Sequence, residues 1–299
     1  MMASPRTPRP LDHLVLPVED LETARARHIS LGFTIAAEAR HPFGTENACV
    51  FFADGSYLEP LAIAQREDCE EAARLGNVFV ARDQAYRFRR GDTGFSALVV
   101  GSKDARADHD RFVGLGMSGG EMLEFSRPMT LPDGSTQTAS FRLAFASDLR
   151  SPDFFGFAVE RVNVPSADRS ALTSHANGVT GIAEVVLSEP NPTDFQYFIQ
   201  ELACNREVEA NSFGMTVALA GAAITVYNKA GMETHLGIDT GPSRERGLLG
   251  RAVVYKVADL QALSALLLNN GVPVRQVAGK LVVDPAPGQG AFYCFEETR

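Results

Sequence analysis

The chain has 299 residues, of which 45% are hydrophobic, 8% aromatic and 22% charged, a composition typical of a soluble globular protein. At about 150 residues per domain, this length predicts two domains or one large one. The formal net charge of −9 argues against a nucleic-acid binder held by phosphate contacts. No apolar run reaches the roughly 18 residues of a membrane helix, so neither nucleic acid nor a membrane is an expected partner.

The N-terminal stretch and the cysteines both favour a cytoplasmic protein. Residues 1–10 are polar and rich in proline, without the apolar stretch of a signal peptide, and we expect a short disordered tail there. The four cysteines form no CxxC pair, so a structural zinc site is not expected. In a chain of this size they are typical of the free thiols of a cytoplasmic protein.

A junction between an apolar strand and an amphipathic helix occurs four times along the chain. In three copies a glycine follows the apolar start by the same 18 residues and is the expected helix stop. The pairs of start and stop are Leu14 and Gly32, Leu98 and Gly116, and Val253 and Gly271. The remaining copy starts at Val185 and ends at Cys204-Asn205, where we expect asparagine to stop the helix. Asp20 and Asp104 are the expected N-caps of the first two helices.

Each helix is followed by short segments with strand character, separated by turn residues. The expected strands are 33–40, 48–53 and 57–64; 121–125, 139–146 and 154–162; 207–211, 216–220 and 223–228; and 274–277, 280–284 and 291–296. The chain is therefore predicted to be an α+β protein of four β-α-β-β-β units. Two units would form each domain, over residues 11–165 and 176–299, with the boundary in the polar stretch 165–177.

Four sequence segments of this repeat resemble a known superfamily. They are LDHLVLPVEDL at the first strand, GTENACVFF followed by YLEPLAI in the same unit, and HANGVTGIAEVVL at the start of the third unit. Together with the paired repeat they resemble the glyoxalase-like branch of the vicinal oxygen chelate superfamily. That superfamily includes glyoxalase I, the extradiol dioxygenases and the fosfomycin- and bleomycin-resistance proteins.

The resemblance implies that each pair of units curls into an open barrel around a divalent metal. In the family, the first and last strands of each unit supply the ligands, and imidazole and carboxylate suit Zn, Fe, Mn, Ni or Co. The matching positions are His13 and Glu59 in unit one, Ala97 or Ser96 and Glu160 in unit two, Glu184 and Thr225 in unit three, and Ala252 and Glu296 in unit four. The expected site is thus His13, Glu59 and Glu160, holding one metal or none, and the second domain is expected to be degenerate.

The residues themselves leave alternatives open. His13 shares a strand face with Val15, where a histidine is either a ligand or a satisfied core residue. Glu59 lies in an apolar run and needs a partner, which a metal, a proton or His13 would supply. Glu160 is either catalytic or paired with Arg161 at the surface.

Four further residues are expected at the substrate pocket, each with an ordinary structural alternative. His41 lies at the pocket rim or in a solvated turn. Thr45 and Asn47 bind a ligand or cap a local turn. Phe157 belongs to an apolar pocket wall or to the core.

These residues support two main hypotheses. The first is a metal-dependent lyase, isomerase or dioxygenase that acts on a small oxygen-bearing substrate, with Glu59 or Glu160 moving a proton. The second is a metal-free protein that binds or sequesters a small molecule, as the bleomycin-resistance proteins do. A third hypothesis is a protein without a working site that acts through a homodimer.

Overall fold

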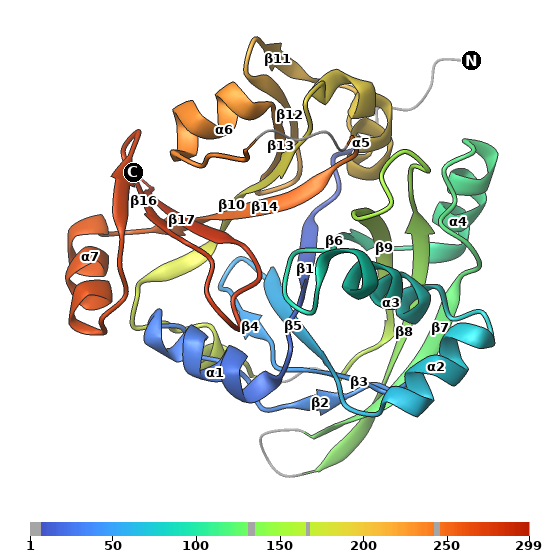
Figure 1. Ribbon diagram of the computed structural model, residues 1–299. Helices are drawn as coiled ribbons and strands as arrows, with labels where there is room; N and C mark the ends of the chain where they lie inside the picture. Colours follow the sequence, from blue (N-terminus) through green and yellow to red (C-terminus); the bar gives the residue numbers. More distant parts are fainter. Residues whose placement is uncertain (1–6, 131–134, 166–167, 242–245, 299) are drawn as a thin grey trace.

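The structure is a computed structural model that describes residues 7–130, 135–165, 168–241 and 246–298. Within these residues the chain forms two large β-sheets, one from each half of the sequence (Figure 1). The strand order is β2-β3-β5-β1-β6-β9-β8-β7 in the first sheet, where β4 also pairs with β5. In the second sheet the order is β11-β12-β13-β10-β14-β17-β16-β15.

The elements of the first half lie between residues 11 and 163. They are β1 (Leu11–Pro17), α1 (Leu21–Ser30), β2 (Ala39–Arg40), β3 (Thr45–Asn47), β4 (Val50–Phe51), β5 (Tyr57–Ile63), α2 (Arg66–Arg74), α3 (Val78–Arg90), β6 (Ala97–Ser102), α4 (Ala105–Gly114), β7 (Leu123–Thr130), β8 (Thr136–Ala146) and β9 (Phe155–Asn163).

The elements of the second half follow from residue 170 onward. They are η1 (Ser170–Leu172), β10 (Val179–Ser188), η2 (Pro192–Phe195), α5 (Gln196–Ala203), β11 (Glu209–Asn211), β12 (Gly214–Ala218), β13 (Ala223–Tyr227), α6 (Lys229–Leu236), β14 (Leu249–Val257), α7 (Leu260–Asn269), β15 (Arg275–Val277), β16 (Lys280–Val283) and β17 (Phe292–Glu297).

Both sheets are built on the same internal pattern. At the centre of the first sheet β1 and β6 run antiparallel, and each is flanked by a parallel strand from its own unit, β5 and β9. The second sheet repeats this arrangement with β10 and β14 at its centre and β13 and β17 beside them. The predicted α+β fold of paired β-α-β-β-β units is confirmed.

The helix ends follow the sequence pattern, with one correction. Asp20 and Asp104 accept hydrogen bonds from the backbone N–H three residues on, so both predicted N-caps are confirmed. Gly32, for example, follows its helix with φ +80°, a conformation that favours glycine. In the third unit the left-handed residue is Cys204, with φ 54°, so the expectation of an asparagine stop is wrong.

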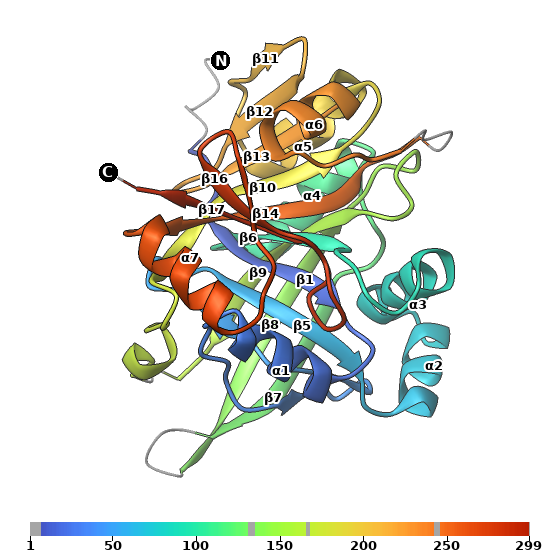
Figure 2. The same cartoon turned by 60° about the vertical axis from the view of Figure 1, so that its left-hand side comes forward.

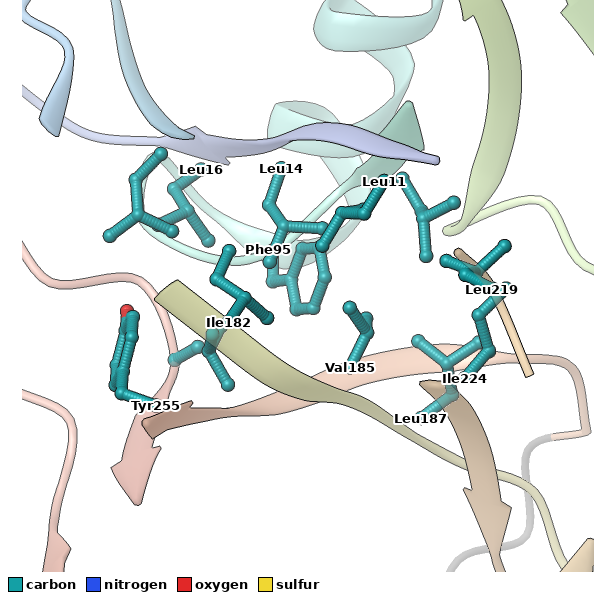
Figure 3. Packing of buried hydrophobic residues seen from close by; sticks show 14 of the residues in the cluster. Leu11, Leu14, Leu16, Phe95, Ile182, Val185, Leu187, Leu219, Ile224 and Tyr255 are labelled. Atoms are coloured by element: carbon teal, nitrogen blue, oxygen red, sulfur yellow. The ribbon is translucent and has the colours of Figure 1, made fainter. Parts of the chain in front are cut away.

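The two sheets share one hydrophobic core between them. Side chains of β1 and β10 point toward each other across this layer, with Tyr255 of β14 beside them (Figure 3). Helices α4, α5 and α7 contribute to the same core, for instance through Phe112, Leu202 and Leu267. The two halves therefore pack closely through this shared core. The opposite face of the first sheet, called its inward face below, encloses a separate cluster of buried residues.

Three helices were not among the predicted elements. Helices α2 and α3 lie between the first two units and stand at the side of the first sheet (Figure 2). Helix α6 follows β13 in the third unit. Helix α3 matters for the site, because Phe79 and Val80 on its first turn join the buried cluster inside the first sheet.

The expected disordered tail is wrong at its last residues. Arg9 pairs with Asp108 and donates to the carbonyl of Gly101, and Pro10 forms a β-bridge with Ala220. Residues 1–6 of the expected tail lie outside the described part of the chain. In the described residues, no helix combines the length and apolar character needed to cross a membrane.

Candidate functional site

A cavity with an accessible volume of about 80 Å³, partly open to solvent, lies inside the first sheet. Its polar lining consists of His13, His41, Asn47, Cys49, Tyr57, Glu59, Arg127, Arg161 and Arg169. Its apolar lining consists of Phe43, Phe51, Phe79, Phe125, Met129, Phe141, Leu143, Phe157, Val159 and Val164. The first unit, the second unit and helix α3 thus all contribute side chains to one chamber.

An irregularity in β1 places Asp12 on the same side as His13, which faces this cavity together with Val15. Leu11 lies opposite Val100 and His13 opposite Val99 of β6, so Asp12 is an extra residue in the pairing. Such a bulge changes the alternation of faces. Leu11 therefore faces the core between the sheets, whereas Asp12 and His13 are both buried on the side of the cavity.

Asp12 orients the imidazole of His13 through the Nδ1 atom of the ring. Asp12 Oδ1 lies 2.7 Å from His13 Nδ1, and the same carboxylate accepts two hydrogen bonds from the guanidinium of Arg161 on β9. The ring of Tyr57 stacks on the imidazole at 4.4 Å between centroids, and Phe157 meets its edge at 5.7 Å. These contacts orient His13 so that its Nε2 atom faces Glu59.

Glu59 lies beside His13 on the neighbouring parallel strand. The register pairs Val15 with Glu59, so the carboxylate points to the same inner face as His13. Glu59 Oε2 lies 3.3 Å from His13 Nε2, and Oε1 accepts a 2.5 Å hydrogen bond from Asn47. The hydrogen bond between His13 and Glu59 is the alternative that the sequence left open for satisfying this buried carboxylate.

The charges of this group stabilise one another. Burial alone would lower the pKa of His13, but hydrogen bonds to Asp12 and Glu59 hold it above its ordinary value. Burial would raise the pKa of Asp12 and of Glu59, yet the imidazole and the other partners of each keep both below their ordinary values. The two carboxylates therefore favour the protonated form of His13, the imidazolium.

His41 is neutral, in contrast to His13. Burial lowers its pKa to about 4, although the nearby charge of Glu59 acts in the other direction. Its Nδ1 lies 2.9 Å from the hydroxyl of Thr45, and its Nε2 lies 3.4 Å from Asn47 Nδ2 and 3.7 Å from Glu59 Oε1. A tautomer that donates from Nδ1 to Thr45 and accepts at Nε2 from Asn47 satisfies these contacts.

The structure thus brings together most of the residues that the sequence assigned to the site. His13, Glu59, His41, Asn47 and Phe157 all line the cavity. Thr45 is fully buried behind them and acts through His41. The solvated turn proposed as the alternative for His41 does not form, because its side chain is buried and hydrogen-bonded.

Glu160 does not lie at the site, so its proposed catalytic and metal-binding roles need correction. Phe157, Val159 and Arg161 face the cavity, and the alternation of β9 places Glu160 on the opposite face. There its carboxylate accepts from the backbone N–H of Ala105 at the start of α4 and pairs with Arg142. Its ion-pair partner is therefore Arg142 rather than the expected Arg161.

The register also settles which positions match Glu59 in the other units. Glu59 lies opposite Val15, and the corresponding pairs are Val99 with Phe157, Val186 with Thr225 and Val254 with Cys294. The residues that match Glu59 are therefore Phe157 in unit two and Cys294 in unit four, instead of the expected Glu160 and Glu296. Glu296 instead forms an ion pair with Lys280.

These positions test whether the residues fit the metal site that the resemblance implied. In the first sheet the four inward positions are His13, Glu59, Ala97 and Phe157, so only two carry a donor. Both nitrogens of His13 already face carboxylates. Across the described residues, no group of three or more His, Cys, Asp and Glu side chains is placed to hold a metal ion. The donor set does not fit the four-ligand metal site.

The corresponding place in the second sheet is packed differently. Its four positions are Glu184, Thr225, Ala252 and Cys294. Burial raises the pKa of Glu184, whose carboxyl group bonds to Thr225. Met232 and Leu236 of helix α6 pack with Ala252 and Cys294 in a buried cluster. The donors of the family are replaced here as well.

Three arginines of the cavity were missed by the sequence reasoning. Arg127 shares a face of β7 with Phe125, and Arg161 shares a face of β9 with Phe157. This period of two residues would have predicted that both arginines point inward, once the inward face of each strand was known. Arg169 precedes the short helix η1, and no pattern in the sequence places it at the cavity.

Comparisons with known proteins agree with this architecture. A family described as "Glyoxalase-like domain" matches residues 11–203. A search of curated proteins finds no match to the sequence. A hypothetical protein from Staphylococcus aureus has a similar structure, with a TM-score of 0.65 and 13% identity, covering 96% of this chain and 99% of the other.

Two further solved structures share the fold. A mutant of 4-hydroxymandelate synthase from Streptomyces coelicolor has a TM-score of 0.61 and 16% identity, over 97% of this chain and 93% of that one. A xylose isomerase-like TIM barrel/4-hydroxyphenylpyruvate dioxygenase fusion protein has a TM-score of 0.54 and 12% identity, over 99% of this chain and 50% of that one. At these identities the likeness concerns the fold alone. Because the family match spans most of the chain, the protein belongs to the glyoxalase-like domain family.

Proposed function

We propose that the cavity of the first sheet binds a small organic molecule without the help of a metal ion. The observation that carries this proposal is the identity of the four inward positions. Ala97 and Phe157 offer no donor atoms, and the remaining two, His13 and Glu59, are bonded to each other. A cavity with aromatic walls and a few oriented polar groups is the usual form of a small-molecule site.

The buried polar residues His13, Asn47 and Glu59, called the floor of the cavity below, would orient such a ligand. The carboxylate of Glu59 is an acceptor, and Asn47 and His13 hold it in place through their own N–H groups. Seven aromatic rings surround them, at Phe43, Phe51, Tyr57, Phe79, Phe125, Phe141 and Phe157. This combination supports a ligand with a flat apolar body and at least one polar atom that reaches the floor.

A second candidate is a lyase or isomerase that transfers a proton without a metal. The observation in its favour is the raised pKa of His13, which favours the protonated form that a general acid needs. Glu59 and His41 are weak bases, because the pKa of Glu59 lies below its ordinary value and that of His41 is about 4. The proton-moving role expected for Glu59 is therefore less well supported than a role for His13.

The family's lyase and dioxygenase chemistry depends on a metal held at the four positions, which the residues present in the first sheet do not fit. For the cellular compartment we propose the cytoplasm, since all four cysteines are free thiols in the structure. The homodimer expected as an alternative stays a prediction.

Ligand screening in the presence of a chelator tests the proposed function. A thermal-shift screen of small organic molecules should give stabilising hits with EDTA present, and Glu59→Gln should weaken them. Glu160→Gln is the matched control, because it changes a carboxylate on the opposite face of the same sheet. Hits that disappear on chelation, or an equal effect of both variants, would contradict a metal-independent site at Glu59.

A further inference from the structure

The cavity carries more positive than negative charge, although the whole chain is acidic. Three arginines line it, Arg127, Arg161 and Arg169, and His13 adds a fourth cation in its protonated form. The carboxylates among or directly behind these groups are Glu59 and Asp12. A cationic chamber in a protein of net charge −9 focuses its field on the space inside.

Arg161 is already neutralised, and the other two arginines are not. Arg161 forms its ion pair with Asp12. Among the described residues, neither Arg127 nor Arg169 has a carboxylate partner, and the Nε atom of Arg127 is buried without a hydrogen-bond partner. Leaving a guanidinium nitrogen unsatisfied in a half-buried place is costly, so a ligand that accepts from it would be favoured.

Both arginines are oriented by aromatic rings. The guanidinium carbon of Arg169 lies 4.5 Å from the ring centroid of Phe51, and that of Arg127 lies 6.0 Å from the centroid of Phe141. Contact with a ring face holds a guanidinium without using its N–H groups. Those donors remain available to the cavity that both rings also line.

We propose that the ligand of this cavity is a small amphipathic carboxylate, whose anionic group is bound by Arg127 and Arg169 and whose apolar body lies between the phenylalanines. This inference rests on the proposed function and adds the chemical class of the ligand. Guanidinium groups match the planar, two-oxygen geometry of a carboxylate. A bare inorganic anion would leave the aromatic walls without a partner.

The position of Glu59 gives the ligand a direction. A second negative charge next to its carboxylate would be repelled, so a polar group that donates a hydrogen bond, such as a hydroxyl, suits this end of the cavity. The carboxylate of Glu59 can accept a hydrogen bond from such a group, while the N–H groups of Asn47 and His13 are engaged by their own partners. The ligand therefore has a single charged end at the arginines and a neutral polar end, if any, at Glu59.

A matched pair of probes tests this inference. Binding of 2-naphthoate and of 2-naphthamide is measured by calorimetry on the full chain, in EDTA, at low and high salt. The anion should bind at least about 10-fold more tightly than the amide, and added salt should reduce this difference. Arg127→Gln and Arg169→Gln should each remove about 10-fold or more of the affinity for naphthoate and leave that for the amide nearly unchanged.

Arg66→Gln is the control variant, because Arg66 is an exposed residue of α2 that pairs with Glu70. Equal affinity for both probes, or arginine variants that bind naphthoate like the parent, would overturn the carboxylate assignment while leaving a small-molecule site in place. If a broad ligand screen also gives no binding, the proposed function itself fails. Near-ultraviolet circular dichroism of each variant separates loss of binding from loss of the fold.

Discussion

Asp12 and His13 are consecutive residues of a β-strand, yet their side chains lie on the same side of it, with 2.7 Å between Asp12 Oδ1 and His13 Nδ1. A regular strand would place them on opposite faces. The bulge at Asp12 removes this alternation, and Arg161 holds the carboxylate in place from β9. The charge on His13 therefore depends on a local irregularity of the backbone as well as on the choice of residues.

Replacing Asp12 by asparagine should lower the pKa of His13. The variant loses a charge and a hydrogen bond that hold this pKa above its ordinary value, whereas burial, which lowers it, remains. NMR titration of the His13 ring protons measures the change directly. Glu124→Gln, which alters an exposed ion pair with Arg106, should leave the titration of His13 unchanged.

The same variant should change how stability depends on pH. Because the pKa of folded His13 is raised, its contribution is fully present below about 6.5 and is lost as the pH rises through the folded value. In Asp12→Asn this loss should be smaller and should occur at lower pH. A pKa of His13 that stays at the parent value in the variant would show that Asp12 does not control the imidazole.

His28 should make the protein less stable in mild acid. It is fully buried, its Nδ1 donates to the carbonyl of Ala24, and burial lowers its pKa to about 4. The neutral form is favoured in the folded state, so its contribution is present above pH 6.5 and is lost as the pH falls toward 4. Full protonation would cost on the order of 3 kcal/mol.

Urea unfolding of the parent and of His28→Gln across this pH range measures the effect. The variant should be less stable than the parent by a constant amount above pH 7. Below pH 6.5 the gap should narrow, because the variant has no imidazole to protonate there. His41 acts in the same direction, so some slope should remain in the variant. Parallel curves for the two proteins would contradict a role for His28.

Gly32 and Gly116 occupy the same place in two repeats but should tolerate alanine differently. Both have positive φ, +80° and +67°. A methyl group at Gly32 would lie 2.9 Å from Leu266 of α7 and from the Cβ atom of Asn177. A methyl group at Gly116 would have no described atom of another residue within 4 Å, its chain neighbours aside. We expect Gly116→Ala to cost about 1 kcal/mol from backbone strain and Gly32→Ala about 2–4 kcal/mol, since overpacking is added.

Chemical unfolding of both variants provides the comparison, with Gly271→Ala as a second open position. If Gly32→Ala destabilises the protein no more than the two others, the close contact between the first helix and the second half does not constrain this glycine. The result bears on the fold directly, because the same glycine that ends α1 also sets its distance from α7.

Much of the fold could be predicted from spacing alone. The constant distance from each apolar start to its glycine identified the repeats, because a helix of fixed length must end where the chain turns back to the sheet. Strands as short as β15, at Arg275–Val277, were found from turn residues on either side. The helices α2 and α3 were missed, since they are an insertion that the repeat pattern does not contain.

The site was predictable only where strand alternation is regular. His13 and Glu59 follow the apolar pattern of their strands, and their inward face was expected correctly for His13 beside Val15. Glu160 was assigned to the site because the sequence did not show which face of β9 it occupies, whereas the matching position is Phe157. The bulge at Asp12 depends on pairing with β6, which a single strand's sequence does not show.

The central claim is that the first cavity functions without a metal ion, and elemental analysis tests it most directly. The full-length protein is incubated with Zn, Fe, Mn, Ni or Co, dialysed, and measured beside His13→Ala treated in the same way. We predict substoichiometric metal in both proteins, with no difference between them. One metal ion per chain in the parent, lost in His13→Ala, would contradict the account.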